Sequence, residues 1–469
     1  MATPKIPPMY KHQKKSVRVG LQLPDHIMYD TSDPGTGKTR VQIEMFKRRK
    51  SRQATLVVAP KSLLSAVWAA DFHKFLPGTR VAIASAGNRE SAFAEDADVY
   101  VINTDGVTWL ADQPKRFLNG FDNLIIDEIT TFKHRNSQRS KAMAKIAQRF
   151  EHRAGLTGTP DPLSVTEMWH QVKILDGGQR LGRSFVQFRN AVSIAEQIGP
   201  QPNMLKWVDR ESAPEAVAGL IADITIRNIF EECVDIPPQT VSIVPYQLTS
   251  KQLRTYRDME KVSIAQASDG AIISAINGAA LRTKLLQIAS GAVYQEVSTG
   301  GKKTERQGFA FIDKARYELV GELVAARKHS VVFFNWSHQR ELLEAEFKKR
   351  KIRYAVIAGG VTDKARAEIV ADYAKGLYQV LLAHPRSAAH GLTLTKATTV
   401  IWVTPTANPE EFIQGNRRIY RISQMFKTEV LVIKAVGTIE EAVVENQERL
   451  NAKQARTLDL FALYFEEHR

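Results

Sequence analysis

Short apolar runs recur along both halves of this chain, with polar and helix-like stretches between them. The runs are rich in Val, Ile and Leu, and they lack the polar alternation of a half-exposed strand. Continuous runs of this kind are typical of parallel strands that are buried on both faces of a sheet. The runs are HIMYDT (26–31), ATLVVAP (54–60), VYVIN (99–103), NLIIDE (123–128), RAGLTG (153–158), SVVFFNW (330–336), YAVIAG (354–359), YQVLLAH (378–384), TTVIWVT (398–404) and EVLVIKAVG (429–437).

Amphipathic segments such as KSLLSAVWAADFHKF (61–75) and HQRELLEAEFKKRK (338–351) separate these runs. The alternation predicts an α/β fold with two doubly wound parallel-sheet lobes. The Pro-Pro pair in VDIPPQT (234–240) is the best candidate for the connection between them. We therefore expect an N-terminal lobe over residues 1–232 and a C-terminal lobe over residues 233–469. Helical insertions are expected at about 165–225 and about 247–310, and a C-terminal brace helix at about 438–469.

The charge balance narrows the class of partner. The 469 residues include 65 Lys and Arg against 50 Asp and Glu, which gives a net charge of +15. This excess favours a polyanionic partner, although a basic protein without such a partner fits the charge equally well. The single cysteine, Cys233, excludes an internal disulfide and a cysteine-built zinc site, and it fits a reducing compartment. No apolar run is long enough for a signal peptide or a membrane span, so we expect a cytoplasmic protein that is not secreted.

The stretch TSDPGTGKT (31–39) joins the first apolar run to a helix-like segment. A strand–loop–helix of this kind binds phosphate, because loop and helix N–H groups face the anion. The strict phosphate-loop pattern has glycine where Ser32 stands, but the remainder of the pattern is intact. Lys38 would reach the β- and γ-phosphates, and Thr39 would hold Mg²⁺. The candidate ATP-binding residues of the loop are Gly35, Thr36, Gly37, Lys38 and Thr39.

Two acids follow a buried run at NLIIDE (123–128). In a phosphate-loop enzyme Asp127 would position Mg²⁺ and Glu128 would polarise the attacking water. Taken alone, two acids at a strand end also fit a solvated loop. After the next run, Thr157 and Thr159 of GLTGTP are candidates for linking hydrolysis to movement, with a simple turn as the alternative.

Arginines lie near the other end of the chain, in QGNRRIYRISQ (414–424). Arg418 and Arg421 are three residues apart and share one face if this segment is helical. A two-lobed ATPase needs arginines that stabilise charge on the γ-phosphate, and these two are the candidates. The alternative is a solvated or DNA-facing basic patch.

Taken in order, these segments resemble those of superfamily-two helicases, and specifically the Swi/Snf-type DNA translocases. DPGTGKT (33–39) is similar to the family's D-x-G-x-G-K-T loop, in which the first glycine of the strict pattern is not expected. VVAPKSLLSAVWAADFHKF (57–75) and DEITTFKHRNSQRSKA (127–142) resemble two further family segments, and GLTGTP resembles L-T-G-T-P. SAAHGLTLTKATTVIWV (387–403) and the arginine segment resemble motifs five and six. The resemblance covers nearly the whole chain. The chain is similar to compact, phage-like versions of the family.

The resemblance implies two RecA-like lobes, ATP and Mg²⁺ as ligands, and DNA as the partner. Gln13 in YKHQKKSV looks like the glutamine that reads the adenine. Trp336 would stack on a base, although an aromatic after a strand is more often packed inside. The implied DNA contacts are Lys61, Ser62, Thr104, Asn335, Trp336, Ser387 and His390. The implied coupling residues are Thr130, Thr157, Thr159 and Gly391.

One departure from the family pattern falls at Ile129 and Thr130, where the family usually has Ala-His. That histidine position normally couples hydrolysis to nucleic-acid binding. The departure leaves the two acids, Asp127 and Glu128, in place.

The sequence as a whole predicts a DNA-stimulated ATPase that translocates on or remodels duplex or branched DNA in replication, recombination or repair. A strand-separating helicase and a DNA-binding scaffold with weak ATPase activity are the alternatives. Double-stranded or branched DNA is the expected partner, with single-stranded DNA left open, and we expect action in the cytoplasm or host cytoplasm on nucleoid DNA. Protein partners, polarity and oligomeric state are not specified by these patterns.

Overall fold

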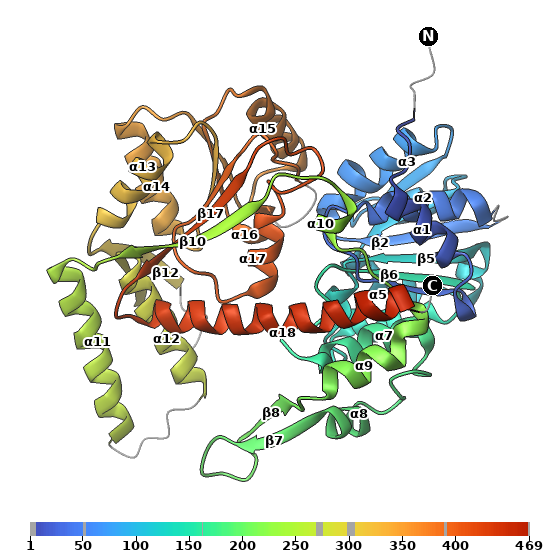
Figure 1. Ribbon diagram of the computed structural model, residues 1–469, viewed down its shortest axis with the longest axis horizontal. Helices are drawn as coiled ribbons and strands as arrows, with labels where there is room; N and C mark the ends of the chain where they lie inside the picture. Colours follow the sequence, from blue (N-terminus) through green and yellow to red (C-terminus); the bar gives the residue numbers. More distant parts are fainter. Residues whose placement is uncertain are drawn as a thin grey trace. The chain divides into compact units, whose positions relative to one another are not determined.

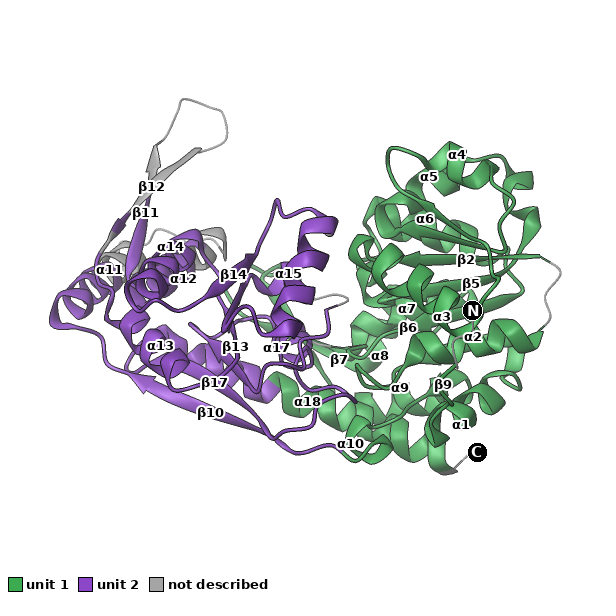
Figure 2. Cartoon of the chain, turned by 90° about the horizontal axis from the view of Figure 1, so that it is seen from above, with its two compact units in different colours: residues 1–235, 450–469 green, residues 236–449 purple. Residues whose placement is uncertain are grey.

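The computed structural model describes residues 6–49, 53–161, 163–268, 275–297, 305–388 and 392–467 of the chain (Figure 1). The chain divides into two compact units (Figure 2). Unit 1 contains residues 1–235 and 450–469, and unit 2 contains residues 236–449.

A seven-stranded parallel sheet forms the centre of the described part of unit 1. Because side chains alternate along a strand, Leu56 and Val58 belong to one buried cluster, and Val57 and Ala59 belong to the cluster on the opposite face. Both faces are therefore covered, as the apolar runs predict. In sheet order the strands are β3 (Val81–Ala84), β4 (Val99–Asn103), β2 (Ala54–Ala59), β5 (Phe121–Asp127), β6 (His152–Leu156), β1 (Ile27–Asp30) and β9 (Thr225–Ile226).

Helices cover both faces of this sheet and continue into the region of the first expected insertion. There, an antiparallel hairpin of β7 (Ser193–Gln197) and β8 (Leu205–Asp209) projects from the helices around it (Figure 1). The insertion therefore contains a hairpin as well as the expected helices. Most of β7 is exposed, so this strand lacks the apolar pattern by which a buried strand is predicted. The helices of unit 1 are α1 (Lys11–Gly20), α2 (Lys38–Arg49), α3 (Ala70–Phe75), α4 (Arg89–Ala94), α5 (Val107–Asp112), α6 (Gln138–Ala147), α7 (Met168–Asp176), α8 (Phe185–Val192), α9 (Ala213–Ile221) and α10 (Phe230–Cys233).

Unit 2 has a six-stranded parallel sheet within its described residues. Val331 and Phe333 face one buried cluster and Val332 faces the other, so this sheet is also covered on both sides. The second expected insertion contains two helices and an antiparallel hairpin. In sheet order the strands are β10 (Gln239–Tyr246), β17 (Thr428–Ala435), β16 (Thr399–Trp402), β13 (Ser330–Phe333), β15 (Val380–Ala383) and β14 (Tyr354–Ile357), and the hairpin is β11 (Ala292–Val297) with β12 (Glu305–Phe311). The helices are α11 (Ser250–Ser268), α12 (Ala275–Ala289), α13 (Ala315–Ala325), α14 (Ser337–Lys349), α15 (Asp363–Lys375), α16 (Pro385–Ala388) and α17 (Pro409–Asn416).

The last helix, α18 (Ile439–Glu467), contributes to both units. The sequence pattern assigned it to the C-terminal lobe, but residues 450–469 group with unit 1. These residues group with unit 1 because of an ion pair and apolar packing. Nζ of Lys453 lies 2.6 Å from the carboxylate of Asp209, and Phe461 is buried in a hydrophobic cluster of unit 1. Within the described residues, no helix is both long enough and apolar enough to cross a bilayer.

The predicted α/β fold with two parallel-sheet lobes is confirmed. Every apolar run of the sequence contains a strand of one of the two large sheets. The pattern missed β3, β9 and β10. β9 has two residues, and β10 is an edge strand whose residues are largely exposed, so neither carries a continuous apolar signal.

A buried histidine makes unit 2 sensitive to acid. The side chain of His338 is fully buried between Ser290 (2.8 Å) and Tyr294 (3.2 Å), and burial lowers its pKa from 6.5 to about 3. Between these two values the unfolded chain binds a proton that the folded chain does not, so stability falls as the pH falls below about 6.5. We expect His338→Gln to remove about 2 kcal/mol of the stability difference between pH 8 and pH 5. Chemical denaturation at both pH values measures this difference, with the exposed His73→Gln as control; equal pH dependence in His338→Gln and the wild type would contradict it.

Candidate nucleotide-binding site

The candidate site residues of unit 1 gather at one edge of its sheet. Because the strands are parallel, their carboxyl ends meet at the same edge, which is where ligands bind in open α/β sheets. The 31–37 loop leaves the end of β1 and leads into α2, while the two acids stand at the end of β5. Between these strands lies β6, which ends in the GLTGTP segment.

Two glycines give the 31–37 loop its shape. Gly35 has φ 95° and Gly37 has φ 86°, in the left-handed region that disfavours other residues. A Cβ on Gly37 would lie 2.3 Å from Nε2 of Gln13, and a Cβ on Gly35 would lie 3.2 Å from the ring of Phe230. Both positions are therefore restricted to glycine by their backbone conformation, as expected of a loop that closely approaches a phosphate.

The loop side chains make hydrogen bonds within the loop. Lys38, the first residue of α2, donates from Nζ to the carbonyl of Ser32 (2.6 Å) and to that of Asp33 (3.3 Å). Thr36 is buried and donates to the carbonyl of Asp33 (2.8 Å). Thr39 follows Lys38 in the first turn of α2 and is half-buried. This places an ammonium group and a hydroxyl beside the amino end of a helix, which favours anions.

Helix α1 closes one side of the loop. Nε2 of Gln13 donates to the carbonyl of Thr36 (3.1 Å), and Oε1 of Gln13 accepts from the backbone N–H of Tyr10 (3.1 Å). The ring of His12 bonds to the same Thr36 carbonyl at 2.8 Å, and burial lowers the pKa of His12. The structure thus places Gln13 against the phosphate loop, whereas its role in reading adenine remains a proposal. Sequence reasoning missed His12.

Two polar residues after β9 hold the start of the loop. The guanidinium of Arg227 lies 2.7 Å from the carboxylate of Asp33, and both side chains are at most 10% exposed. The same carboxylate accepts from the N–H of Phe230 (2.9 Å). Asn228 donates to the hydroxyl of Ser32 from its backbone (3.0 Å) and from its side chain (2.9 Å). The serine at the strict-glycine position is therefore a buried acceptor that joins the loop to the segment after β9.

The acid pair at the end of β5 has two different environments. Asp127 is buried and accepts from Nε1 of Trp68 (2.8 Å) and from the backbone N–H of Glu128 (3.1 Å). Burial raises the pKa of Asp127, while the Trp68 hydrogen bond and the charge of Lys38 act in the opposite direction. Glu128 is half-buried with φ 52°, so the backbone turns sharply between the two acids. Trp68, in a segment that carried the family resemblance, is a positioning residue that the sequence did not single out.

The unusual pair after these acids is buried in the protein. Ile129 is fully buried, and a Cβ added to Gly155 would lie 2.6 Å from its Cδ1. Thr130 is 4% exposed. Ile129 therefore packs directly on the glycine that opens GLTGTP, which brings the two motifs into contact.

The GLTGTP segment also contacts the phosphate loop. The N–H of Thr157 donates to the carbonyl of Asp30 (3.0 Å), and Oγ1 of Thr157 accepts from the N–H of Thr159 (3.1 Å). A Cβ on Gly158 would lie 2.7 Å from the ring of Pro34. Thr157 and Thr159 are buried, so their contacts are structural in this conformation and their coupling role remains a proposal.

The expected DNA contacts of unit 1 lie at the ends of β2 and β4, which share an edge with the acid pair. Lys61 is exposed and Ser62 half-buried, both in a short 3₁₀ helix after β2. Thr104 is 8% exposed at the end of β4, so it offers little surface to a ligand.

The remaining candidates belong to unit 2. Asn335 follows β13 and donates to the hydroxyl of Thr404 (3.1 Å). Trp336 is half-buried and stacks on His338, with ring centroids 5.8 Å apart, so at least part of its ring packs inside the unit. Ser387 is half-buried in α16. His390 and Gly391 lie outside the described residues.

The two arginines of motif six follow α17 and do not share a helix. That helix ends at Asn416, and the chain continues in turns. Nε of Arg418 donates to the carbonyl of Gln414 (2.9 Å), and Arg418 is 4% exposed. Nη1 of Arg421 donates to the hydroxyl of Thr393 (3.2 Å), and burial lowers the pKa of Arg421 to about 10.

A parallel α/β sheet with a glycine loop after its first strand and an acid at the end of a nearby strand is the arrangement of P-loop nucleotide-binding proteins. Comparison with known families is more specific. The SNF2-related domain matches residues 12–292, and the helicase conserved C-terminal domain matches residues 315–423. The first match alone covers more than half of the chain, so this protein belongs to the SNF2-related family and carries helicase-like ATPase domains.

Several relatives align with most of this chain. It is 27% identical to "Putative protein p41" of Acyrthosiphon pisum secondary endosymbiont phage 1, over 90% of this chain and 91% of that protein. It is 23% identical to "Uncharacterized ATP-dependent helicase MG018" of Mycoplasma genitalium and 24% identical to human "DNA annealing helicase and endonuclease ZRANB3". These alignments cover 96% and 87% of this chain but only 42% and 36% of the two helicases. The phage relative agrees with the predicted compact, phage-like version.

The comparison with solved structures matches the chain to the "Sulfolobus solfataricus SWI2/SNF2 ATPase core in complex with dsDNA". It is 20% identical, with a TM-score of 0.43, and the match covers 98% of this chain and 96% of that one.

Proposed function

We propose that this protein is a DNA-stimulated ATPase that translocates on or remodels duplex or branched DNA. The observation that carries the proposal is the joint placement of the phosphate loop and the Asp127–Glu128 pair at one edge of the unit 1 sheet, in a chain of the SNF2-related family. The relative named for DNA annealing supports DNA as the partner, as does the net charge of +15. We further propose that the protein acts in replication, recombination or repair, in the cytoplasm and on nucleoid DNA.

The residues of unit 1 fit ATP and Mg²⁺. Gly35 and Gly37 leave space where a Cβ would otherwise stand, and Lys38 supplies a cation for the β- and γ-phosphates. Thr39 and Asp127 would hold Mg²⁺, which when bound neutralises charge on the phosphates. Gln13 would position the adenine.

Hydrolysis requires a base or orienting group for water, and we assign this role to Glu128. The backbone turns sharply at Glu128, with φ 52°, and we assign the two acids different roles. Arg418 and Arg421 are assigned to stabilise charge on the γ-phosphate in the transition state. Thr130, Thr157, Thr159 and Gly391 are assigned to couple hydrolysis to DNA movement.

The DNA contacts are proposed at Lys61, Ser62, Thr104, Asn335, Trp336, Ser387 and His390. Among these residues, a substitution of Lys61 gives the clearest test of a DNA contact, because its side chain is exposed and charged. Phosphate contacts of this kind are independent of sequence and weaken with salt.

The experiment that tests the function measures ATP turnover by the full chain against double-stranded DNA, single-stranded DNA and RNA. We expect turnover to rise at least tenfold with saturating double-stranded DNA at low salt, and to fall as salt increases because phosphate contacts release counterions. Lys61→Ala should raise the DNA concentration needed for half-stimulation severalfold, with the exposed Lys74→Ala as control.

The outcomes separate the alternatives. No DNA-stimulated turnover, with DNA binding retained, would indicate a scaffold with weak ATPase activity, and stimulation by RNA alone would indicate an RNA remodeller. Displacement assays on blunt, tailed and forked duplexes then distinguish a strand-separating helicase from a translocase.

A further inference from the structure

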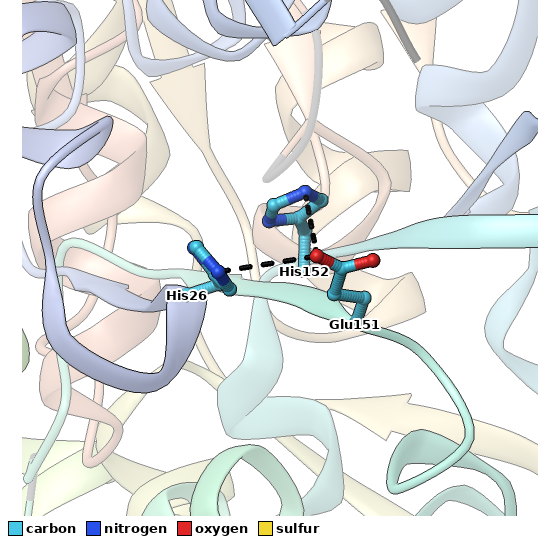
Figure 3. Close-up of side chains that lie close together, drawn as sticks. All are labelled: His26, Glu151 and His152. Carbon is cyan, nitrogen blue, oxygen red and sulfur yellow. Dashed lines mark ion pairs between the residues drawn. The ribbon is translucent and has the colours of Figure 1, made fainter. Parts of the chain in front are cut away.

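Three metal-ligating side chains meet at the edge of the unit 1 sheet opposite the phosphate loop. His26 ends the short 3₁₀ helix Pro24–His26 just before β1, and Glu151 and His152 lie at the start of β6. Strands β1 and β6 are parallel neighbours with Ile27 opposite Arg153, so residues at their amino ends lie side by side. Figure 3 shows the two imidazoles and the carboxylate turned toward one another.

The distances within this cluster are close to those of a coordination sphere. Nε2 of His26 and Nε2 of His152 each lie 3.9 Å from Oε1 of Glu151, and one ligand atom from each residue lies within 4.8 Å of the others. Two donors of a tetrahedral zinc ion are about 3.3–3.5 Å apart, given metal–ligand bonds of about 2.0–2.2 Å. Closing the site would take a contraction of about half an ångström between each imidazole and the carboxylate, and of up to about 1.5 Å between the two imidazole nitrogens. The His26 and Glu151 side chains are 54% and 63% exposed and free to make that movement.

The backbone and the burial of the cluster point to a ligand. Asp25 and His26 both have positive φ, 53° and 54°, an uncommon conformation that brings the His26 ring within 4.6 Å of the His152 ring. His152 is 16% exposed, and its Nδ1 is buried with no hydrogen-bond partner in the described part of the chain. The other ring nitrogen of His152, Nε2, faces the Glu151 carboxylate beside a second imidazole, and this donor set fits a transition-metal cation.

The kind of cation follows from the donors and the surrounding charge. Two imidazoles and one carboxylate suit zinc, nickel and copper, whereas Mg²⁺ and Ca²⁺ prefer sets made of oxygen atoms alone. The positive charge of Arg49 acts on His152 and would repel a bound cation. The negative charges of Asp122 and Glu151 offset this repulsion. The exposed side chains of His26 and Glu151 leave the donor atoms open to an ion from solvent.

We propose that His26, Glu151 and His152 bind one divalent transition-metal ion of the zinc class, with water completing its coordination. This site is separate from the proposed Mg²⁺ position, because β1 alone places about 10 Å between the two edges of the sheet. The ion would join the amino ends of β1 and β6, whose carboxyl ends carry the phosphate loop and Thr157. Its role is to stabilise the strand pair that supports the loop.

Isothermal titration of the tag-free full chain with Zn²⁺, without nucleotide, tests the site directly. We expect about one equivalent per chain, no response to Mg²⁺, and a rise in thermal midpoint with Zn²⁺. His26→Ala and Glu151→Gln should each weaken Zn²⁺ binding at least tenfold and remove the thermal shift. Both side chains are largely exposed, so these variants should fold. The exposed His73→Ala, in α3, is the matched control and should bind Zn²⁺ as the wild type does.

Coordination is read independently with Co²⁺, whose visible absorption reports a tetrahedral or five-coordinate site. His152→Ala should abolish that absorption. The inference is overturned if no saturable Zn²⁺ binding occurs, or if His26→Ala binds Zn²⁺ with unchanged affinity. Because none of these measurements uses ATP or DNA, they are independent of the proposed motor activity.

Discussion

Replacing Lys38 by alanine is expected to reduce ATP turnover by about 100-fold or more, because it removes the cation that we assign to the β- and γ-phosphates. Among the described residues, the Lys38 ammonium donates hydrogen bonds to two carbonyl oxygens of its own loop, those of Ser32 and Asp33. Loss of these two hydrogen bonds should leave the fold intact, so the defect should appear in turnover and nucleotide affinity. Steady-state hydrolysis with saturating double-stranded DNA and binding of a fluorescent ATP analogue measure the two effects.

The matched control is Lys47→Ala, which removes an exposed lysine from the same helix. A second comparison, Glu128→Gln, should keep nucleotide binding and lose hydrolysis, since the amide retains the shape of the side chain but does not polarise water. Wild-type turnover in Lys38→Ala would show that the 31–39 loop is not the site of hydrolysis. A defect of equal size in Lys47→Ala would show that the loss comes from the helix and not from the phosphate contact.

The placement of this loop could be predicted because it depends on local signals. The signals are a buried apolar run, the glycines that follow it and the start of a helix. Because the strands are parallel, the residues that follow them lie at the same end of the sheet. The same reasoning predicted Asp127 and Glu128 at the end of a neighbouring strand; the structure has them at the end of β5, which β6 separates from β1. Periodicity could not predict β10 or the β7–β8 hairpin, since an exposed strand has no continuous apolar run.

The contacts that support the loop could not be predicted for a different reason. Asp33 and Arg227 are joined only in the folded chain, and a buried polar pair has no signature in local sequence. Ser32 shows the same limit: read locally it is a departure from the strict pattern, but in the structure its hydroxyl accepts two hydrogen bonds from Asn228.

The departure at Ile129 and Thr130 has a clearer physical meaning once the structure is known. Ile129 fills the space over Gly155, so motions of the acid segment and of GLTGTP are constrained by direct packing. Packed side chains with few alternative arrangements transmit displacement, which is one way for hydrolysis and movement to be coupled without the family's usual histidine. Thr130 is buried beside this contact and is the first position to examine for altered coupling.

Arg227→Ala is expected to lower the free energy of unfolding of unit 1 by about 3–5 kcal/mol, because it leaves the carboxylate of Asp33 buried without its cation. Arg227 also donates to the carbonyl of Thr31 (2.6 Å), so the same substitution frees the start of the phosphate loop. ATP affinity should therefore fall together with stability. Denaturation with urea measures the first effect, and hydrogen exchange over the loop and residues 226–233 shows whether the loss is centred there.

The exposed Arg116→Ala is the matched control and should change stability by less than about 0.5 kcal/mol. The combined variant Arg227→Met with Asp33→Asn removes both charges, so it should be more stable than Arg227→Met alone. The side-chain amide introduced by Asp33→Asn keeps an acceptor for the N–H of Phe230, which limits the cost of that second change. If Arg227→Met and the combined variant are equally unstable, the loss comes from packing or from the Thr31 hydrogen bond, and the buried charge of Asp33 is not what makes Arg227 necessary.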